Sequence, residues 1–216
     1  MRAGRKATEL MERAGLPKEM TAKFRTLIIA LLAVALLAPT GAIAEGKGKR
    51  KHHRAPAPAR VTQDCPDADL EPTADNQGRI RAAILCLHNQ IRAENGLPRL
   101  RENKRLRKAA VGHSRNMVAK KFFEHTTPSG VTMVDRILKA RYVREDQGWM
   151  LGENLAWGTG SYATPRGAIQ AWMESPGHRA NILKRSYREM GVGLVLGVPV
   201  SDAAGATYTV DFGVRR

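Results

Sequence analysis

Four polar side chains in the C-terminal half of the chain have the chemistry of a metal or acid–base site. Two are histidines and two are glutamates, in the segments FFEHTTPSG, LGENLAWG and AWMESPGH: His125, Glu153, Glu174 and His178. Neutral imidazole nitrogens ligate divalent cations such as zinc, and carboxylates orient the ligating rings by accepting their other N–H. If the fold brings the four together, the two histidines can share a metal ion while the glutamates hold the rings.

Local spacing does not by itself bring these residues together. Glu174 and His178 are four residues apart, as on one helix face, but Pro176 disfavours a helical conformation at Ser175. The pattern predicts that one helix ends here and another begins, with Ser175 as the cap and Pro176 at the first helical position. Any site that includes both residues must come from the tertiary structure.

Sequence motifs of hydrolytic enzymes are absent. The chain contains neither H-E-x-x-H nor G-x-S-x-G, and Ser114 and its neighbour His113 face different sides of a helix. His113 lies in an apolar stripe, so it is predicted to be a buried, hydrogen-bonded core residue with Trp172 packed beneath it. Trp157 is also predicted to be a packing residue.

Apolar spacing and capping signals predict the first two helices. One stripe consists of Ile80, Ile84, Leu87 and Ile91. Its helix should end at Asn95-Gly96, where glycine suits the left-handed cap. Asn103 is a plausible cap for the second helix. The stripe of that helix consists of Leu106, Ala110, His113 and Met117.

Later segments predict two more helices and then strands. Thr132 and Asp135 form an acidic capping box that opens a short helix, and Thr164 before Pro165 starts another that reaches Glu174. Near the C-terminus, MGVGLVLG and TYTVDFGV predict two strands joined as a hairpin. Because helices come first and strands last, the sequence predicts an α+β fold in a single domain.

The N-terminal region has the features of an export signal. Residues 27–38, LIIALLAVALLA, form an apolar run shorter than the ~20 residues that span a membrane, and the small-residue pattern AIA follows. Met20 stands before a compact basic segment and is the start that suits a signal of normal length. We therefore expect residues 1–44 to be a signal peptide and the protein to be secreted. The alternatives are a buried helix or an uncleaved membrane anchor.

The segment that follows is predicted to be a basic linker and N-terminal arm, residues 45–79, ahead of a domain at 80–216. It begins with GKGKRKHHRAPAPAR, which has no apolar periodicity. Residues 1–60 hold 13 Lys and Arg against 4 Asp and Glu, and residues 61–216 hold 23 against 16. This linker is expected to be a disordered, solvated tether, and the alternative is that it contacts anionic cell-envelope polymers or lipid headgroups. Specific nucleic-acid binding is not expected, because the basic run lacks interleaved aromatics.

Cys65 and Cys86 are the only cysteines in the sequence. We expect them to form a disulfide, because exported chains meet an oxidising environment. The alternative is a pair of buried thiols. A zinc site made from these cysteines is not expected, since two thiolates without suitably spaced histidines do not complete a tetrahedron.

Several motifs occur in an order that resembles a known family. HSRNM, FFEHTTPSG, GENLAWG, AWMESPGHRANIL and MGVG, between about Ile80 and Val214, are similar to bacterial CAP (SCP-like) domains, the superfamily of cysteine-rich secretory proteins, antigen 5 and pathogenesis-related proteins. The resemblance implies a three-layer α-β-α sandwich with a central cleft. A histidine and glutamate tetrad of the cleft maps onto His125, Glu153, Glu174 and His178. Asn154 and Asn181 are expected to tie down the cleft loops.

The resemblance favours a binding function over catalysis, because no general catalytic activity unites the family. It implies a secreted module whose cleft takes a divalent metal ion, such as zinc, and a small lipid-like or cell-envelope ligand. A metal-assisted or carboxylate-assisted peptidase or esterase that uses the same cleft is the alternative, and a structural or wall-interaction role is a third. This chain has two cysteines rather than many, and SPGHRANIL replaces a longer aromatic signature. The sterol-binding loops, partner surfaces and toxin activities of eukaryotic members are therefore not expected to transfer.

Overall fold

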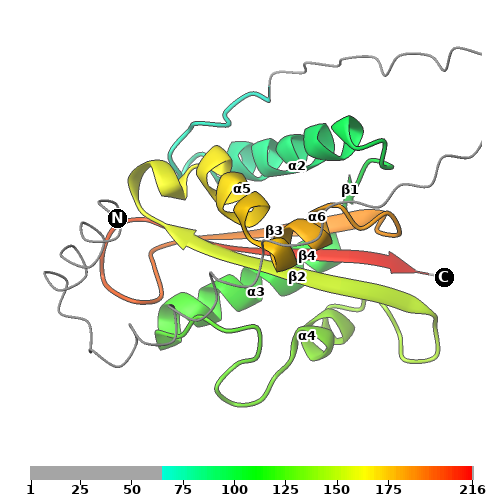
Figure 1. The fold of residues 1–216 in the computed structure, drawn as a ribbon. Helices are drawn as coiled ribbons and strands as arrows, with labels where there is room; N and C mark the ends of the chain where they lie inside the picture. The colour runs from blue at the N-terminus through cyan, green and yellow to red at the C-terminus, as the bar shows by residue number, and fades with distance from the viewer. Residues whose placement is uncertain (1–64, 216) are drawn as a thin grey trace, which may run out of the picture. The chain divides into compact units, whose positions relative to one another are not determined.

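The computed structural model describes residues 65–215, which form helices around one sheet (Figure 1). The predicted signal peptide and the basic run 46–60 lie outside the described residues. The helices are α2 (Gln77–Glu94), α3 (Lys104–Lys120), α4 (Met133–Lys139), α5 (Pro165–Glu174) and α6 (Pro176–Ile182), with the short 3-10 helix η2 (Gly160–Ala163). The strands are β1 (Arg101–Glu102), β2 (Trp149–Gly158), β3 (Glu189–Leu196) and β4 (Ala206–Arg215). No helix within residues 65–215 is long and apolar enough to cross a bilayer.

The predicted caps of α3 and α4 are confirmed. The side-chain oxygen of Asn103 accepts hydrogen bonds from the backbone N–H groups of Arg105 at 2.9 Å and Leu106 at 3.3 Å. At α4, the Thr132 hydroxyl accepts from the Asp135 N–H at 3.2 Å, and the Asp135 carboxylate accepts from the Thr132 N–H at 2.8 Å. These bonds satisfy donors that have no partner inside the helix, so they fix where each helix begins.

The predicted break between Glu174 and His178 is also confirmed. Helix α5 ends at Glu174, Ser175 is extended with φ −94° and ψ 118°, and α6 begins at Pro176. Helix α2 also ends where the sequence predicts, because Gly96 has φ +62°, in the left-handed region that favours glycine. Glu174 and His178 therefore lie on different helices.

The strands form one mixed sheet in the order β1-β3-β4-β2. β1 is parallel to β3, while β4 is antiparallel to both β3 and β2. The β3 and β4 pairing confirms the predicted hairpin. The sequence pattern does not predict β2, because its neighbouring polar residues Glu153 and Asn154 are both buried and remove the expected apolar and polar alternation. As an edge strand, β2 leaves one of its sides open to the elements that carry the candidate site.

Helices cover both faces of the sheet (Figure 1). The core on the α2, α5 and α6 face contains Ile80, Ile84, Trp172, Ile182, Met190, Val192, Tyr208, Val210 and Phe212. The core on the α3 and α4 face contains Leu106, Ala109, Ile137, Tyr142 and Val143. These two cores confirm an α+β fold arranged as a three-layer α-β-α sandwich in a single domain.

Two glycines of β3 allow α3 to lie directly on the sheet. A Cβ atom at Gly191 would stand 2.0 Å from the backbone nitrogen of Arg107, and one at Gly193 would stand 2.3 Å from the backbone carbonyl carbon of Ala110. Side chains at these positions would force the helix away from the strand. The two glycines of the MGVG segment therefore determine how closely α3 packs on the sheet. α3 is the helix that leads into the loop carrying His125.

The predicted disulfide is present. Cys65 and Cys86 are bonded, with their Cα atoms 5.7 Å apart, so the segment before α2 is tied to α2. Ala68 of this segment is buried, and its carbonyl oxygen accepts a hydrogen bond from the backbone N–H of Arg166 at 2.8 Å. The residues after the basic linker thus pack on the domain before the first helix begins.

The tryptophan predictions are only partly confirmed. Trp172 is 1% exposed, but its ring contacts those of His88 and Tyr208, with centroids 5.7 and 6.4 Å apart. It is therefore not beneath His113, which is buried in α3 on the other face of the sheet. Trp157 is 40% exposed, so the prediction that it packs in the core is wrong. It is the penultimate residue of the edge strand, where packing is less complete.

A second buried histidine links stability to pH. His88 is fully buried in α2, and its Nδ1 lies 2.8 Å from the carbonyl oxygen of Ile84. Burial lowers the pKa of His88 from 6.5 to about 4. Between these values the unfolded chain binds a proton that the folded chain does not, so this group lowers the free energy of unfolding as pH falls from 6.5 to about 4.

We expect His88→Phe to remove this part of the pH dependence, because phenylalanine keeps an aromatic ring between Trp172 and Phe212. When pH is lowered from neutral to about 4, the free energy of unfolding of the parent should fall by about 3 kcal/mol more than that of the variant. Urea unfolding of both proteins at a series of pH values measures the difference. Parallel pH profiles would show that His88 is not kept neutral.

Candidate functional site

A buried carboxylate joins two side chains that are distant in the sequence. Glu153 Oε1 accepts a hydrogen bond from His125 Nδ1 at 2.8 Å, and Glu153 Oε2 accepts one from Arg136 Nη2 at 2.6 Å. The side chain of Glu153 is 2% exposed and that of Arg136 is 10% exposed, whereas that of His125 is 57% exposed. An accessible imidazole is thus held in place by a buried ion pair.

Three elements position this group. Glu153 lies on β2, Arg136 lies in α4, and His125 lies in the loop between α3 and α4. Arg136 Nη1 also donates to the carbonyl oxygens of His125 at 3.0 Å and Val131 at 3.2 Å. The same guanidinium therefore holds both the carboxylate and the loop that presents the imidazole.

Electrostatics fix the protonation of the pair. Burial alone would raise the pKa of Glu153, but the hydrogen bond from His125 and the charge of Arg136 outweigh it and hold this pKa below its usual value. The hydrogen bond to Glu153 in turn raises the pKa of His125. An ionised carboxylate can only accept, so the His125 proton is on Nδ1 and the neutral ring presents a lone pair at Nε2.

His178 lies on α6, beside the same edge strand. Asn154 Nδ2 donates to the His178 carbonyl oxygen at 3.0 Å, and Asn181 Nδ2 donates to the Glu153 carbonyl at 3.1 Å and to Asn154 Oδ1 at 2.9 Å. Through these bonds the two asparagines tie α6 to the edge strand β2. Partial burial and the positive charge of His125 lower the pKa of His178.

Glu174 lies at the end of α5, exposed to solvent. Its Oε1 accepts a hydrogen bond from Gln170 Nε2 at 3.0 Å. It also lines a surface hollow of about 320 Å³, whose lining residues are Met173, Glu174, Pro176, Arg179, Ala180 and Leu183. These contacts of Glu174 involve neither histidine, so the convergence of the complete tetrad stays a prediction.

The residues present suit an open site with two histidine ligands. Of the four histidines in residues 65–215, His88 and His113 are buried, and His125 and His178 are accessible. His125 already has a carboxylate on the nitrogen opposite the ligating one, as metal-bound imidazoles have. No group of three or more His, Cys, Asp and Glu side chains in this part of the chain is arranged to hold a metal ion. Among the residues that the structure describes, His125 and His178 are therefore the two accessible imidazoles that could ligate a metal ion.

Two residues beneath the site were not found by the sequence analysis. One is Arg136, whose helix gives no signal of a functional role. The other is Asp211 of β4, which is paired with Glu153 across the sheet and is fully buried. Burial, together with the charge of Glu153, raises the pKa of Asp211 well above its usual value. A carboxyl residue in the middle of the apolar strand TYTVDFGV is the signal that could have revealed it.

The predicted burial of His113 is confirmed, and it lies close to the same cluster. Its Nε2 is 2.9 Å from the carbonyl oxygen of Glu124, next to His125 in the chain. Burial lowers the pKa of His113, while the charge of Glu153 acts in the opposite direction. His113 is therefore a support beneath the loop of His125, as a core histidine would be.

We expect Glu153→Gln to lower the pKa of His125, because the hydrogen bond and charge of the carboxylate favour the imidazolium. NMR titration of the histidine ring protons measures this shift. Glu174→Gln is the matched control, since Glu174 hydrogen bonds with Gln170, and it should leave the His125 titration unchanged. An unchanged His125 pKa in Glu153→Gln would contradict the proposed electrostatic coupling.

Sequence comparisons identify relatives over most of the folded part. The model of the Cysteine-rich secretory protein family (CAP) matches residues 85–210. The uncharacterized protein YkwD of Bacillus subtilis is 32% identical over 142 residues, which cover 66% of this chain and 51% of that protein. The uncharacterized membrane protein YlbC of the same species is 33% identical over 111 residues, covering 51% of this chain and 30% of that protein. The chain thus spans about half or less of these relatives.

Solved structures agree with this assignment. An extracellular protein containing an SCP domain from Bacillus anthracis has 30% sequence identity and a TM-score of 0.53, over 67% of this chain and 44% of that chain. An outer surface protein from Borrelia burgdorferi has 20% identity and a TM-score of 0.55, over 68% of this chain and 100% of that chain. This similarity shows the fold alone. The family match covers more than half of the sequence and spans His125, Glu153, Glu174 and His178. The chain therefore belongs to the Cysteine-rich secretory protein (CAP) family.

Proposed function

We propose that this protein is an extracellular binding module that takes a divalent metal ion, zinc, on His125 and His178. The observation that carries the proposal is the buried Glu153, which fixes the His125 ring through Nδ1 and leaves Nε2 accessible. A bound cation would supply positive charge and open coordination positions for a ligand. Such a site, with two protein ligands, binds modestly.

The extracellular location is supported by several features. The apolar run 27–38 followed by AIA has the pattern of an export signal, and the Cys65 and Cys86 disulfide suits an oxidising compartment. One similar solved structure is called extracellular, while the relative YlbC is called a membrane protein. We propose that this chain acts outside the cytoplasm, whether released or anchored.

The ligand part of the proposal rests on the hollow beside α6. This hollow, of about 320 Å³, combines the apolar side chains of Met173 and Leu183 with the charged groups of Glu174 and Arg179. Its volume lies at the lower end of the range for small-molecule sites. A small amphiphilic cell-envelope molecule, with a short apolar part and a polar head, matches this lining. α6 carries His178, so the same helix would contact both the ligand and the metal.

The pKa shifts predict how metal binding depends on pH. A protonated imidazole cannot ligate, and the pKa of His125 is raised by Glu153. As pH is lowered, zinc affinity should therefore begin to fall while the pH is still above 6.5, the ordinary pKa of histidine. His178 should become protonated, and so lose its ability to ligate zinc, only at a lower pH, because burial and the charge of His125 lower its pKa.

Calorimetric titration of the full chain with zinc tests the proposal. His125→Ala with His178→Ala should abolish uptake while circular dichroism shows an intact fold, and Glu153→Gln should weaken it by roughly 10- to 100-fold. His52→Ala with His53→Ala is the matched control, because it removes the adjacent histidines of the basic linker and should leave uptake unchanged. Undiminished binding in the His125 and His178 double variant would refute the site.

Hydrolysis is a second candidate, favoured by the same hydrogen bond. An imidazole whose Nδ1 proton is held by a buried carboxylate is the arrangement of a general base, with Nε2 free to take a proton from water. We expect any peptide or ester cleavage by the full chain to persist after chelation of metal ions and to disappear in His125→Ala. Cleavage that survives in His125→Ala would exclude this residue as the base.

A further inference from the structure

The outer face of α3 carries an unusual concentration of positive charge. The helix, KRLRKAAVGHSRNMVAK, contains no acidic residue. Its exposed positions are Lys104, Arg105, Lys108, Gly112, Arg115, Ala119 and Lys120. Five of these seven side chains are cationic and the other two residues are small. The helix therefore presents basic side chains to solvent along its length, with no exposed apolar side chain of appreciable size among them.

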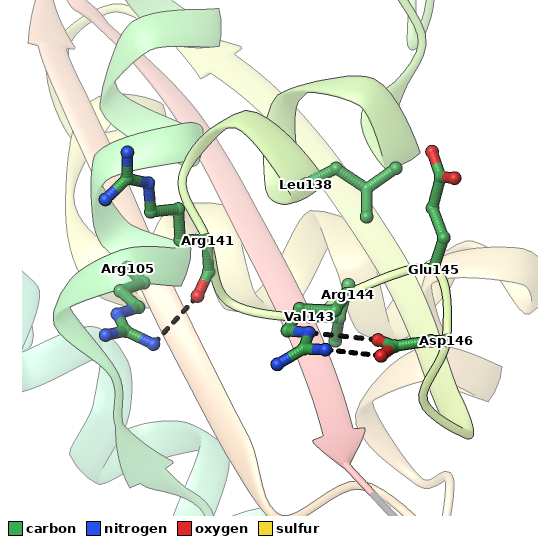
Figure 2. Close-up of a pocket in the computed structure, with 7 residues that line it drawn as sticks. All are labelled: Arg105, Leu138, Arg141, Val143, Arg144, Glu145 and Asp146. Carbon is green, nitrogen blue, oxygen red and sulfur yellow. Dashed lines mark hydrogen bonds and ion pairs between the residues drawn. The ribbon is translucent and has the colours of Figure 1, made fainter.

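A hollow of about 640 Å³ adjoins the first turn of α3 (Figure 2). Its floor includes Leu138 and Val143, and its rim carries three arginines and two acidic residues: Arg105, Arg141, Arg144, Glu145 and Asp146. Figure 2 shows Arg105 and Arg141 on one side and Glu145 and Asp146 on the other. Two of the three arginines thus lie on the side of α3, whereas the acidic residues lie on the other side.

The cations on the α3 side lack carboxylate partners. Arg144 pairs with Asp146, with Nε 3.0 Å from Oδ1. Arg105 Nη1 instead donates to the backbone carbonyl oxygen of Arg141 at 2.8 Å, which holds these two cationic residues side by side. Within residues 65–215, no ion pair involves Arg105, Lys108 or Arg141. Like charges held together without an acid form a region of positive potential that attracts anions.

We propose that this basic face, defined as Lys104, Arg105, Lys108, Arg115, Lys120 and Arg141, binds a linear polyanion of the cell envelope whose charges are repeated phosphodiester groups. The face is separate from His125 and His178, and the proposal does not depend on metal binding. Guanidinium and ammonium groups both bind phosphate oxygens, and arginine does so through a planar fork.

The length of the face favours a polymer over a small anion. From Lys104 to Lys120, α3 rises by about 24 Å, at about 1.5 Å per residue. One phosphate could contact only one or two of the cations spread over this distance. A flexible chain with regularly spaced phosphates can contact them in succession, and each contact releases condensed counterions.

The absence of large apolar side chains from this face argues against a bilayer as the partner. The exposed large hydrophobic residues within 65–215 are Val131, Trp157, Tyr162, Leu196 and Val200. Leu196 is the last residue of β3, at the end of the sheet away from β1, and Trp157 of β2 lies at the same end, with β4 between them. The hollow and the first turn of α3 adjoin the opposite end, whereas the last turn of α3 approaches Gly197. Surface binding to lipid normally combines basic residues with inserted apolar ones.

Binding of the full chain to poly(glycerol phosphate), measured by calorimetry over a series of salt concentrations, tests the proposal. The test variant is Lys108→Glu with Arg141→Glu, because neither side chain has a described hydrogen bond. The matched control is Arg99→Glu with Lys184→Glu, which makes the same change of charge at exposed positions outside α3 and the hollow. Both variants keep the basic linker. Vesicles containing phosphatidylglycerol form a parallel arm.

We expect the test variant to bind the polymer roughly 30-fold more weakly than the control, since it loses two cations and each cation near an anionic surface contributes about 1 kcal/mol. The slope of log affinity against log salt should decrease by about 1.4 for two lost phosphate contacts on a flexible strand. Equal losses in both variants would overturn the proposal, because binding would then follow net charge or the linker. Binding to vesicles without binding to the polymer would overturn it in favour of a bilayer.

Discussion

A carboxylate enclosed by protein needs compensating partners, and at Glu153 those partners connect most of the site. With only 2% of its side chain exposed, Glu153 would be too costly to ionise without the hydrogen bonds from His125 and Arg136. These bonds tie the edge strand to α4 and to the loop before it. The Glu153 carbonyl meanwhile accepts from Asn181 of α6. One residue thus joins strand, loop and two helices, and the orientation of the accessible imidazole follows from its burial.

The edge position of β2 explains how residues from opposite faces of the sheet come together. The side chain of Glu153 faces the α3 and α4 layer, and Asn154, one residue later, faces α6. In the middle of the sheet these two layers would be separated by neighbouring strands. At the edge, α6 can hold His178 beside the strand while the loop from α3 brings His125 to the other face. The candidate site is therefore located where the sheet stops.

A buried arginine supports this arrangement from a distance. Arg92 of α2 is fully buried and donates hydrogen bonds to carbonyl oxygens at and just after the end of α6, those of Ile182 at 2.7 Å and Lys184 at 3.0 Å. A buried guanidinium is costly unless its donors are satisfied, so these bonds fix the end of α6 relative to α2. The helix that carries His178 is thus held at both of its ends, by Asn154 at one and Arg92 at the other.

The sequence by itself determined the elements whose signals are local. The Asn103 cap, the Thr132 and Asp135 capping box, and the Ser175-Pro176 break each depend on residues within one turn, and all three occur in the structure. The Cys65 and Cys86 pairing followed from there being only two cysteines. Family resemblance supplied the layered fold and the four candidate residues, which local spacing alone could not bring together.

Only the tertiary structure decided which charged groups meet. Strand β2 escaped the sequence analysis because Glu153 and Asn154 are buried on opposite faces, and burial of this kind depends on partners from other elements. Arg136, which is 17 residues before Glu153 in the sequence, joins the site by a hydrogen bond to the Glu153 carboxylate. Asp211 joins it because β4 pairs Asp211 with Glu153 in the sheet. Trp157 is exposed because its strand is at the edge, and Trp172 packs on His88 because α5 and α2 share a face. Helix caps and breaks are local interactions within the chain, whereas burial and charge pairing depend on surfaces that exist only once distant segments have packed.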